Sequence, residues 1–362
     1  MMPETDILEA LREDTLALPP LRVRLDSEGS RLETGGRLRR PDANASVDVT
    51  WKDRTFRFAA ELTVQTTPKA FHDAIERIRA AASAAEMRPL LVAPYLAPER
   101  LEELESRGVS GIDLSGNGVV VVPGELLVFR TGNPNRYPAG RRIRNVYAGA
   151  SSLVARVFLL RPRFETVQSV MDEITARGGR VSLSTVSKVL KVLDEDLVIR
   201  RDGRTSELLQ PDELLDRLAD SYRPPRAGAL RSYRWVGGPV DLGEALAGWG
   251  GRLVRTGEAS VDRYAVMPRE KTSRCYCTSI TIVEERLQGR LDEEARFPDL
   301  ELIKTGDPTV YFDTRSEDGV PAASPIQCWL ELQAGDKRQV DAATTVRGRM
   351  LEQLRSGGWK PA

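Results

Sequence analysis

The sequence predicts a multidomain α+β protein with an N-terminal α/β domain, a central and mainly helical domain, and a C-terminal α+β domain. Its 362 residues exceed what a single hydrophobic core usually covers. Two segments rich in Pro and Gly, residues 131–145 and 221–233, interrupt the periodicity of helices and strands. The order of the expected elements changes at both segments, so we place the domains at residues 1–145, 146–215 and 222–362.

The composition is that of an ordinary globular protein, with 41% hydrophobic and 29% charged residues. The formal net charge is +0, so the molecule as a whole has no attraction to nucleic acid or to an anionic membrane. Basic residues are concentrated between Pro138 and Pro211, where eleven Arg and two Lys stand against eight Asp or Glu. The chain starts with an acidic segment and has no apolar run long enough to cross a bilayer. We therefore expect a cytoplasmic protein without membrane contact.

The N-terminal domain is expected to be a mixed sheet with helices packed on it, because two strand–helix steps follow one another. The expected elements, in order, are a helix beginning near residue 4, strands at 47–51 and 55–64, a helix at 69–86, a strand at 89–96, a helix at 97–108, a strand at 110–114, a turn at 115–118 and an apolar run at 119–129. No Gly-Lys-Ser/Thr follows the glycines of that turn, so the segment indicates a hairpin turn and not a phosphate-binding loop.

The central domain contains two helices joined by a short turn. The first is expected to run from Thr166 to Ala176 and to end at the pair Gly178-Gly179. Ser182 is expected to cap the second helix, from Leu183 to about Asp194, because a serine hydroxyl accepts the backbone N–H groups of a first helical turn. The buried stripe of this helix follows three- and four-residue spacing and consists of Leu183, Val186, Leu190 and Leu193.

The other face of the second helix is polar and carries short hydroxyl side chains and lysines. Small side chains let a helix enter a major groove about 12 Å wide, and lysines bind phosphates. A hairpin closed by Asp202-Gly203 follows, with basic residues beside its tip. Helix, turn, helix and basic hairpin together predict a winged helix-turn-helix that binds DNA.

A merely solvated face is the alternative, because serine and lysine on an exposed helix are usually only hydrated. The order of the elements, the basic hairpin and a stretch of six arginines without an acid between Pro138 and Phe164 favour DNA binding. Those arginines, Arg141, Arg142, Arg144, Arg156, Arg161 and Arg163, could follow a phosphate backbone or lie in a minor groove. The predicted DNA-binding residues are Ser182, Ser184, Thr185, Ser187, Lys188, Lys191, Arg200, Arg201, Arg204, Arg141, Arg142 and Arg144.

The C-terminal domain alternates strands and helices after Pro224-Pro225, which ends a helix at 211–220. We expect strands at 274–283 and 307–314 and helices at 325–333 and 340–354. Three cysteines, Cys275, Cys277 and Cys328, and the single histidine, His72, support neither a disulfide framework nor a zinc site. We expect reduced thiols and no metal or cofactor.

Two acids in the N-terminal domain raise the question of a nuclease. A strand pair carrying an acid and ending in Glu-x-Lys is typical of metal-dependent nucleases, whose carboxylates hold the ion and whose lysine supports the attacking water. Asp48 and Glu61 occupy such positions, but Thr63 stands where the lysine belongs. The pattern fits a degenerate nuclease-like domain, or simply acids on an exposed sheet edge. We therefore expect no catalytic residues and no enzyme activity.

Three parts of the chain resemble the AbiEi family of type IV antitoxins, bacterial transcriptional regulators paired with a nucleotidyltransferase-like toxin. They are LLVAPYLAPERLEELESRGVSGIDLSGNGVVV, the winged helix-turn-helix, and TGEASVDRYAV with the later ASPIQCWLELQ and AATTVRGRML. The resemblance implies a winged helix that represses the toxin–antitoxin promoter, and a separate domain that opposes the toxin without forming a stable complex. The simplest members begin with the winged helix, whereas about 145 residues precede it here.

The expected function is sequence-specific DNA binding by a transcriptional regulator that represses its own operon. The expected partners are duplex DNA of a promoter or operator, a nucleotidyltransferase-like toxin, and a second copy of the chain in a homodimer. Two alternatives remain. One is a nucleic-acid-processing enzyme whose nuclease-like domain is targeted by the winged helix, and the other is an interaction protein whose winged helix binds protein.

Overall fold

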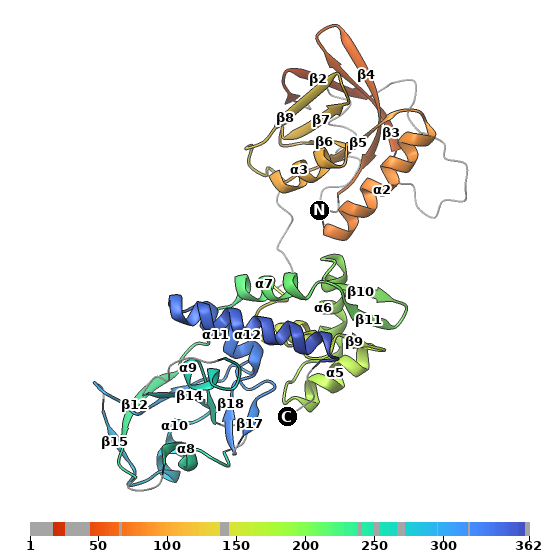
Figure 1. Ribbon diagram of the computed structural model, residues 1–362. Helices are drawn as coiled ribbons and strands as arrows, with labels where there is room; N and C mark the ends of the chain where they lie inside the picture. The colour runs from red at the N-terminus through yellow and green to blue at the C-terminus, as the bar shows by residue number, and fades with distance from the viewer. Residues whose placement is uncertain are drawn as a thin grey trace. The chain divides into compact units, whose positions relative to one another are not determined.

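The computed structural model describes residues 17–25, 44–64, 67–137, 145–237, 241–249, 253–265, 272–294, 296–317 and 319–358. The chain separates into two compact units, which we call the N-terminal unit (Met1–Arg142) and the C-terminal unit (Ile143–Ala362). In Figure 1 the first is coloured red to yellow and the second yellow-green to blue. Both mix helices with sheets, which agrees with the expected α+β class.

The N-terminal unit is built on one eight-stranded sheet in which neighbouring strands follow the order of the sequence. The pairs β4–β5 and β5–β6 are parallel and the other pairs are antiparallel. Helices α2 (Pro68–Ala84) and α3 (Pro98–Ser106) make the two parallel connections. The strands are β1 (Ala17–Leu18), β2 (Leu21–Leu25), β3 (Asn44–Trp51), β4 (Arg54–Leu62), β5 (Arg88–Ala93), β6 (Ser110–Asp113), β7 (Gly118–Val122) and β8 (Leu126–Arg130).

The two faces of this sheet bury separate cores, because successive side chains of a strand point to opposite faces. Val47 and Phe58 belong to the core on one face, whereas Ala59 and Leu91 pack with the apolar side chains of α2 and α3 on the other. The sheet curls strongly: a Cβ atom on Gly118 of β7 would lie 3.1 Å from the side chain of Leu18 in β1. The same Cβ would lie 2.8 Å from the carbonyl oxygen of Gly111, so glycine is required at this close approach.

The elements expected for the N-terminal unit are present from β3 onward. The apolar run 119–129 forms the β7–β8 hairpin, whose turn uses the positive φ of Gly124. Strands β1 and β2 were not predicted from the sequence. The helix expected near residue 4 lies outside the described residues.

The C-terminal unit begins with helices and a small antiparallel sheet of order β10-β11-β9. Helix α4 contacts both α5 and α6, and all of its side chains are buried. The elements are η1 (Gly149–Ser151), α4 (Ser152–Phe158), β9 (Arg163–Phe164), α5 (Val167–Ala176), α6 (Leu183–Glu195), β10 (Ile199–Asp202), β11 (Thr205–Leu208) and α7 (Pro211–Ser221).

A seven-stranded mixed sheet of order β15-β12-β16-β14-β13-β18-β17 follows in the C-terminal unit. Its strands are β12 (Ala229–Trp235), β13 (Leu253–Arg255), β14 (Ser273–Cys277), β15 (Leu291–Glu293), β16 (Leu300–Lys304), β17 (Arg315–Glu317) and β18 (Val320–Ala322). The helices of this part are α8 (Leu242–Ala245), α9 (Glu258–Val261), α10 (Ile280–Arg286), α11 (Pro325–Gln333) and α12 (Lys337–Arg355).

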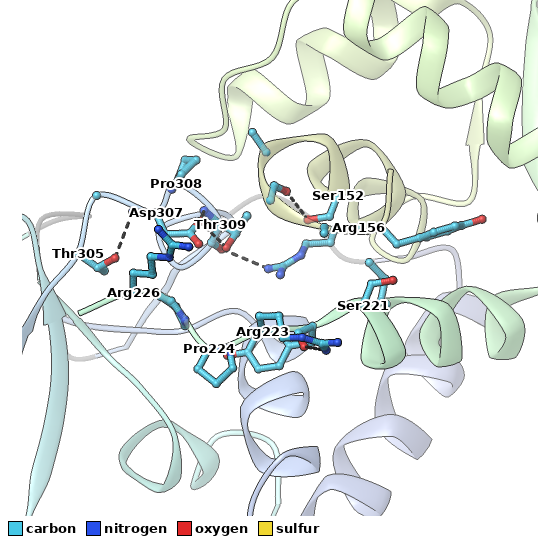
Figure 2. A pocket seen from close by; sticks show the side chains of 18 residues that line it. Ser152, Arg156, Ser221, Arg223, Pro224, Arg226, Thr305, Asp307, Pro308 and Thr309 are labelled. Carbon is cyan, nitrogen blue, oxygen red and sulfur yellow. Dashed lines mark hydrogen bonds between the residues drawn. The ribbon is translucent and has the colours of Figure 1, made fainter. Parts of the chain in front are cut away.

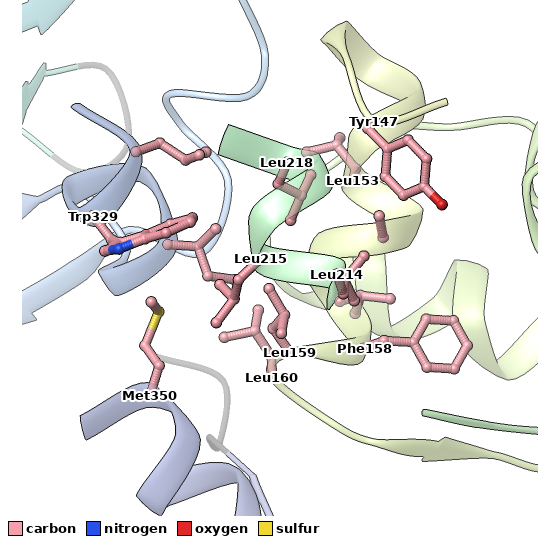
Figure 3. Close-up of a cluster of buried hydrophobic side chains, with 14 of the residues drawn as sticks. Tyr147, Leu153, Phe158, Leu159, Leu160, Leu214, Leu215, Leu218, Trp329 and Met350 are labelled. Carbon is pink, nitrogen blue, oxygen red and sulfur yellow. The ribbon is translucent and has the colours of Figure 1, made fainter. Parts of the chain in front are cut away.

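One hydrophobic core joins the first helices of the C-terminal unit to its last two. Figure 3 shows Leu215 and Leu218 of α7 lying between Leu153 of α4 and Trp329 of α11. Met350 of α12 belongs to the same cluster. The expected division of this unit into domains 146–215 and 222–362 stays a prediction, and the two segments share this core.

Two expected strands of the C-terminal unit are wrong in whole or in part. Only the first half of 274–283 is a strand, because Ile280 and Val283 bury one side of the short helix α10. Segment 307–314 forms turns: Asp307 Oδ1 accepts hydrogen bonds from the Thr309 backbone N–H at 2.9 Å and from its hydroxyl at 2.8 Å. Such local bonds offer the backbone an alternative to a strand. The helices expected at 325–333 and 340–354 are confirmed as α11 and α12.

Candidate nucleic-acid interface

The turn between α5 and α6 is set by caps and glycines. Thr166 caps α5 in a reciprocal arrangement with Ser169, and Gly178 after its end has a φ of 78°. A Cβ on Gly179 would lie 2.7 Å from a methyl carbon of Ile174, so this position also requires glycine. The Gly178-Gly179 pair therefore permits the short connection that the sequence predicts.

Helix α6 begins as expected, because the Ser182 side chain accepts a hydrogen bond from the Thr185 backbone N–H. Val186, Leu190 and Leu193 are buried, together with Val189. Leu183, which we expected in the buried stripe, is 44% exposed. It is the first residue of the helix, so its side chain lies one turn before the buried stripe begins.

The predicted polar face of α6 is accessible. Ser184, Ser187, Lys188 and Lys191 are exposed, and Thr185 is partly exposed. The Ser182 hydroxyl lies 2.9 Å from both the Ser184 and the Thr185 hydroxyl oxygens. Lys191 Nζ lies 3.7 Å from Glu195 Oε1, whereas Lys188 makes no ion pair within the described part of the chain. Helix α6 thus presents short hydroxyl groups near its start and cations further along.

The β10–β11 hairpin carries the three predicted arginines in different settings. Its two-residue loop is Gly203-Arg204, one residue later than expected, and Gly203 has a φ of 56°. Arg200 donates to Glu207 at 2.8 Å across the strand pair, which neutralises part of its charge. Arg201 is half-buried, and Arg204 at the turn is exposed without an ion pair to any described residue.

Arg180 was not among the predicted site residues. It lies two residues before the α6 cap Ser182, is exposed, and makes no ion pair with the residues that the structure describes. Its position in the sequence could have indicated this role, because a residue directly after the Gly178-Gly179 turn lies beside the start of α6. Arg180, Lys188 and Arg204 are therefore three cations of this region that no described carboxylate neutralises.

None of the described arginines in the expected basic stretch before α5 is an exposed cation without an ion pair. Arg141, Arg142 and Arg144 lie outside the described residues. Arg156 is only 3% exposed, so its expected place along a phosphate backbone is wrong. It lies on α4, all of whose side chains are buried. Arg161 pairs with Glu173 at 3.2 Å, and Arg163 pairs with Glu165 at 3.1 Å.

The two acids of the nuclease hypothesis do not form a common site. Asp48 faces Arg57 across the β3–β4 pair, with 3.6 Å between Oδ1 and Nε. Glu61 is buried and accepts a hydrogen bond at 2.7 Å from Arg77 of α2. Its cross-strand partner is Asn44, four residues from Asp48 along β3. No group of three or more His, Cys, Asp or Glu that could hold a metal ion occurs among the described residues.

Comparisons of the chain with protein-family models, with curated proteins and with solved structures found no match. Within the ranges that the structure describes, no helix has both the length and the apolar character needed to span a membrane. Cys275, Cys277 and Cys328 are unbridged and buried. Burial raises the pKa of the Cys275 and Cys328 thiols to about 12, which keeps them protonated at neutral pH.

Proposed function

We propose that the protein is a sequence-specific DNA-binding transcriptional regulator. In this proposal α5, α6 and the β10–β11 hairpin act as a winged helix-turn-helix, with α6 in the major groove. The observation that carries the proposal is the face of α6, where Ser184, Thr185, Ser187 and Lys188 remain accessible while the opposite stripe is buried. Packing of α6 against the core involves only the buried stripe, so it does not account for the hydroxyl groups on the opposite face. Those hydroxyl groups are donors and acceptors that suit base edges.

Three exposed cations without a described ion-pair partner support the same orientation. Arg180 precedes α6, Lys188 lies on its exposed face, and Arg204 lies at the tip of the hairpin. Cations that are not neutralised by neighbouring carboxylates release counterions from phosphates on binding. Arg200 and Arg163 are paired with carboxylates, so we assign them a smaller share of the affinity.

The test is footprinting on the DNA upstream of the protein's own coding region. A Thr185→Ala/Lys188→Ala variant should lose discrimination between this site and unrelated DNA by about 5- to 150-fold, since one good base contact contributes about 1–3 kcal/mol. The matched control is Arg338→Ala/Thr344→Ala, which removes one exposed cation and one exposed threonine from α12. An unchanged footprint for the α6 variant would remove α6 from the interface.

The resemblance to type IV antitoxins adds a second part to this proposal, namely that the protein represses its own operon and opposes a nucleotidyltransferase-like toxin. The test is co-expression with such a gene if one lies beside its own. The full-length protein should restore growth without co-purifying with the toxin. The Thr185→Ala/Lys188→Ala variant should restore growth equally well, because DNA binding and toxin opposition belong to separate parts of the chain in that family.

A further inference from the structure

A cavity of about 510 Å³ lies within the C-terminal unit, bordered by α4, the end of α7 and the segment 305–309 (Figure 2). Its volume falls in the range of about 300–1,000 Å³ that small-molecule sites occupy. Tyr147, Leu218 and Tyr222 supply apolar wall, and Arg156, Arg223 and Arg226 supply positive charge. A ligand that fits this lining needs an apolar part and an anionic group.

Arg156 is a buried cation whose hydrogen bonds go to neutral groups. Its Nη1 donates to the Thr309 carbonyl oxygen at 3.2 Å and to Gln327 Oε1 at 2.9 Å. Its Nε has no hydrogen-bond partner among the described residues. Burial lowers the pKa of Arg156 to about 10, so the guanidinium is still charged at neutral pH. A buried charge that lacks an ion-pair partner is costly unless a ligand supplies the opposite charge.

The carboxylates of Asp307 and Glu331 act on the Arg156 charge through space, but neither forms an ion pair or a hydrogen bond with it among the described residues. Gln327 Nε2 donates to Glu331 Oε1 at 2.7 Å, so one amide side chain separates Glu331 from Arg156. Glu331 also accepts hydrogen bonds from the Thr256 hydroxyl and from the Gly257 backbone N–H. Asp307 is the one carboxylate in the described lining, and its Oδ1 accepts both hydrogen bonds from Thr309. The lining therefore carries three cations against one anion.

The two outer arginines lie at the edge of the same cavity. Arg223 Nη1 donates to the carbonyl oxygens of Asp220 and Tyr222, and these bonds leave its charge without a carboxylate partner. Arg226 is exposed and makes no ion pair within the described ranges. A guanidinium has a planar set of donors that matches a carboxylate or a phosphate.

We propose that this cavity binds a small organic oxyanion, with its phosphate or carboxylate group on Arg156, Arg223 and Arg226 and its uncharged part against Tyr147, Tyr222 and Leu218. A guanidinium group can bind either a phosphate or a carboxylate, and the experiment below shows which of the two this cavity prefers. The site is independent of the proposed DNA contact, because none of these side chains belongs to the exposed face of α6 or to the β10–β11 hairpin.

The test is isothermal titration calorimetry on the full-length protein without DNA, using phenyl phosphate, benzoate and the neutral benzyl alcohol. At least one oxyanion should bind with a stoichiometry of one, and benzyl alcohol should bind at least tenfold more weakly. The tighter of the two oxyanions identifies the ligand class as a phosphate or a carboxylate. Binding of neither oxyanion, or equal binding of benzyl alcohol, overturns the proposal.

Variants locate the binding. Arg223→Gln/Arg226→Gln changes exposed residues, so it should fold normally and weaken oxyanion binding at least tenfold. Arg156→Gln should abolish binding if circular dichroism shows a folded protein. Arg231→Gln, an exposed arginine paired with Glu293 at 2.6 Å, is the control that should bind as tightly as the wild type. Unchanged binding by the Arg223→Gln/Arg226→Gln variant overturns the assignment to this cavity.

Discussion

Two arginines three residues apart in the turn between α5 and α6 have opposite surroundings. The Arg177 side chain is 1% exposed, and its Nη1 lies 2.7 Å from Asp313 Oδ1. Arg180 is exposed and makes no ion pair with the described residues. Both count equally toward the basicity of the central segment, yet only Arg180 can reach a phosphate. A sum of charges along a sequence therefore overstates the charge that a surface offers to DNA.

The same contrast separates Arg156 from Lys188. Arg156 lies on a helix whose side chains are all buried, and it lines a cavity. Lys188 lies on the open face of α6. We therefore expect the buried Arg177 to act on stability and the buried Arg156 on ligand binding, whereas the exposed cations of the candidate interface determine affinity for DNA. The predictions below separate these two roles.

The largest expected effect is on stability. Arg177→Ala should lower the free energy of unfolding by about 3–5 kcal/mol, because it leaves the buried Asp313 carboxylate with only part of its ion pairing. Arg180→Ala should change it by no more than about 0.5 kcal/mol. Urea denaturation followed by tryptophan fluorescence measures both, since four of the five tryptophans lie after residue 142. Equal effects of the two substitutions would contradict the comparison.

A second prediction applies the contrast between buried and exposed charges to the buried acid Glu331, and it concerns the pH dependence of stability. Burial raises the pKa of Glu331, although hydrogen bonds from Thr256, Gln327 and Gly257 oppose this shift. A carboxyl with a raised pKa in the folded state stabilises the fold fully below its unfolded pKa, near 4.3, and this contribution is lost as pH rises through the folded value. Glu331→Gln should therefore gain stability relative to wild type as pH rises from 5 to 8.

The control for this measurement is the accessible acid of α6. Glu195→Gln should change the free energy of unfolding by no more than about 0.5 kcal/mol, because Glu195 is only partly buried and pairs loosely with Lys191 at 3.7 Å. If Glu331→Gln follows the wild-type curve at every pH, the Glu331 carboxyl titrates as an ordinary glutamate and its burial does not determine its protonation.

Local signals in the sequence predicted the elements that position the candidate interface. Ser182 as a cap, the Gly178-Gly179 turn and the stripe from Val186 to Leu193 depend on neighbours a few residues away, and all three are confirmed. The strand expected at 307–314 failed because Asp307 bonds to Thr309 within the same turn. Its apolar residues, such as Phe312, are buried in a core shared with distant helices.

The long-range features could not be read from the sequence. The burial of Arg156 depends on Thr309 and Gln327, more than 150 residues away, and nothing near Arg156 in the chain indicates these partners. The same holds for Arg177, whose partner Asp313 is 136 residues distant. The cavity beside Arg156 arises from three separated segments, so it could only be found once the fold was known.

The cap of α6 gives a smaller effect that isolates helix geometry from DNA chemistry. Ser182→Ala should lower the free energy of unfolding by about 1 kcal/mol, because the Thr185 N–H loses its acceptor. Ser182→Gly should lower the free energy of unfolding by only a few tenths of a kcal/mol. Ser187→Ala, on the exposed face of the same helix, should leave thermal stability unchanged or slightly higher, since alanine is the better helix former. A large loss for Ser187→Ala would mean that this face is not simply exposed.

The smallest effect per residue concerns the salt dependence of DNA binding, and it tests the exposed side of the comparison directly. Arg180→Ala and Arg204→Ala should each flatten the slope of log K against log salt concentration by about 0.9, because each is expected to neutralise one phosphate. Both should weaken binding to all sequences alike. Arg163→Ala should flatten the slope less, since Glu165 already neutralises that charge at 3.1 Å. Fluorescence anisotropy with a labelled duplex from 50 to 200 mM salt measures all three variants. An equal change of slope for Arg163→Ala and Arg180→Ala would contradict the comparison, because ion pairing within the protein would then not indicate which cations contact DNA. The arginines at 141, 142 and 144 would in that case need the same test as a triple variant.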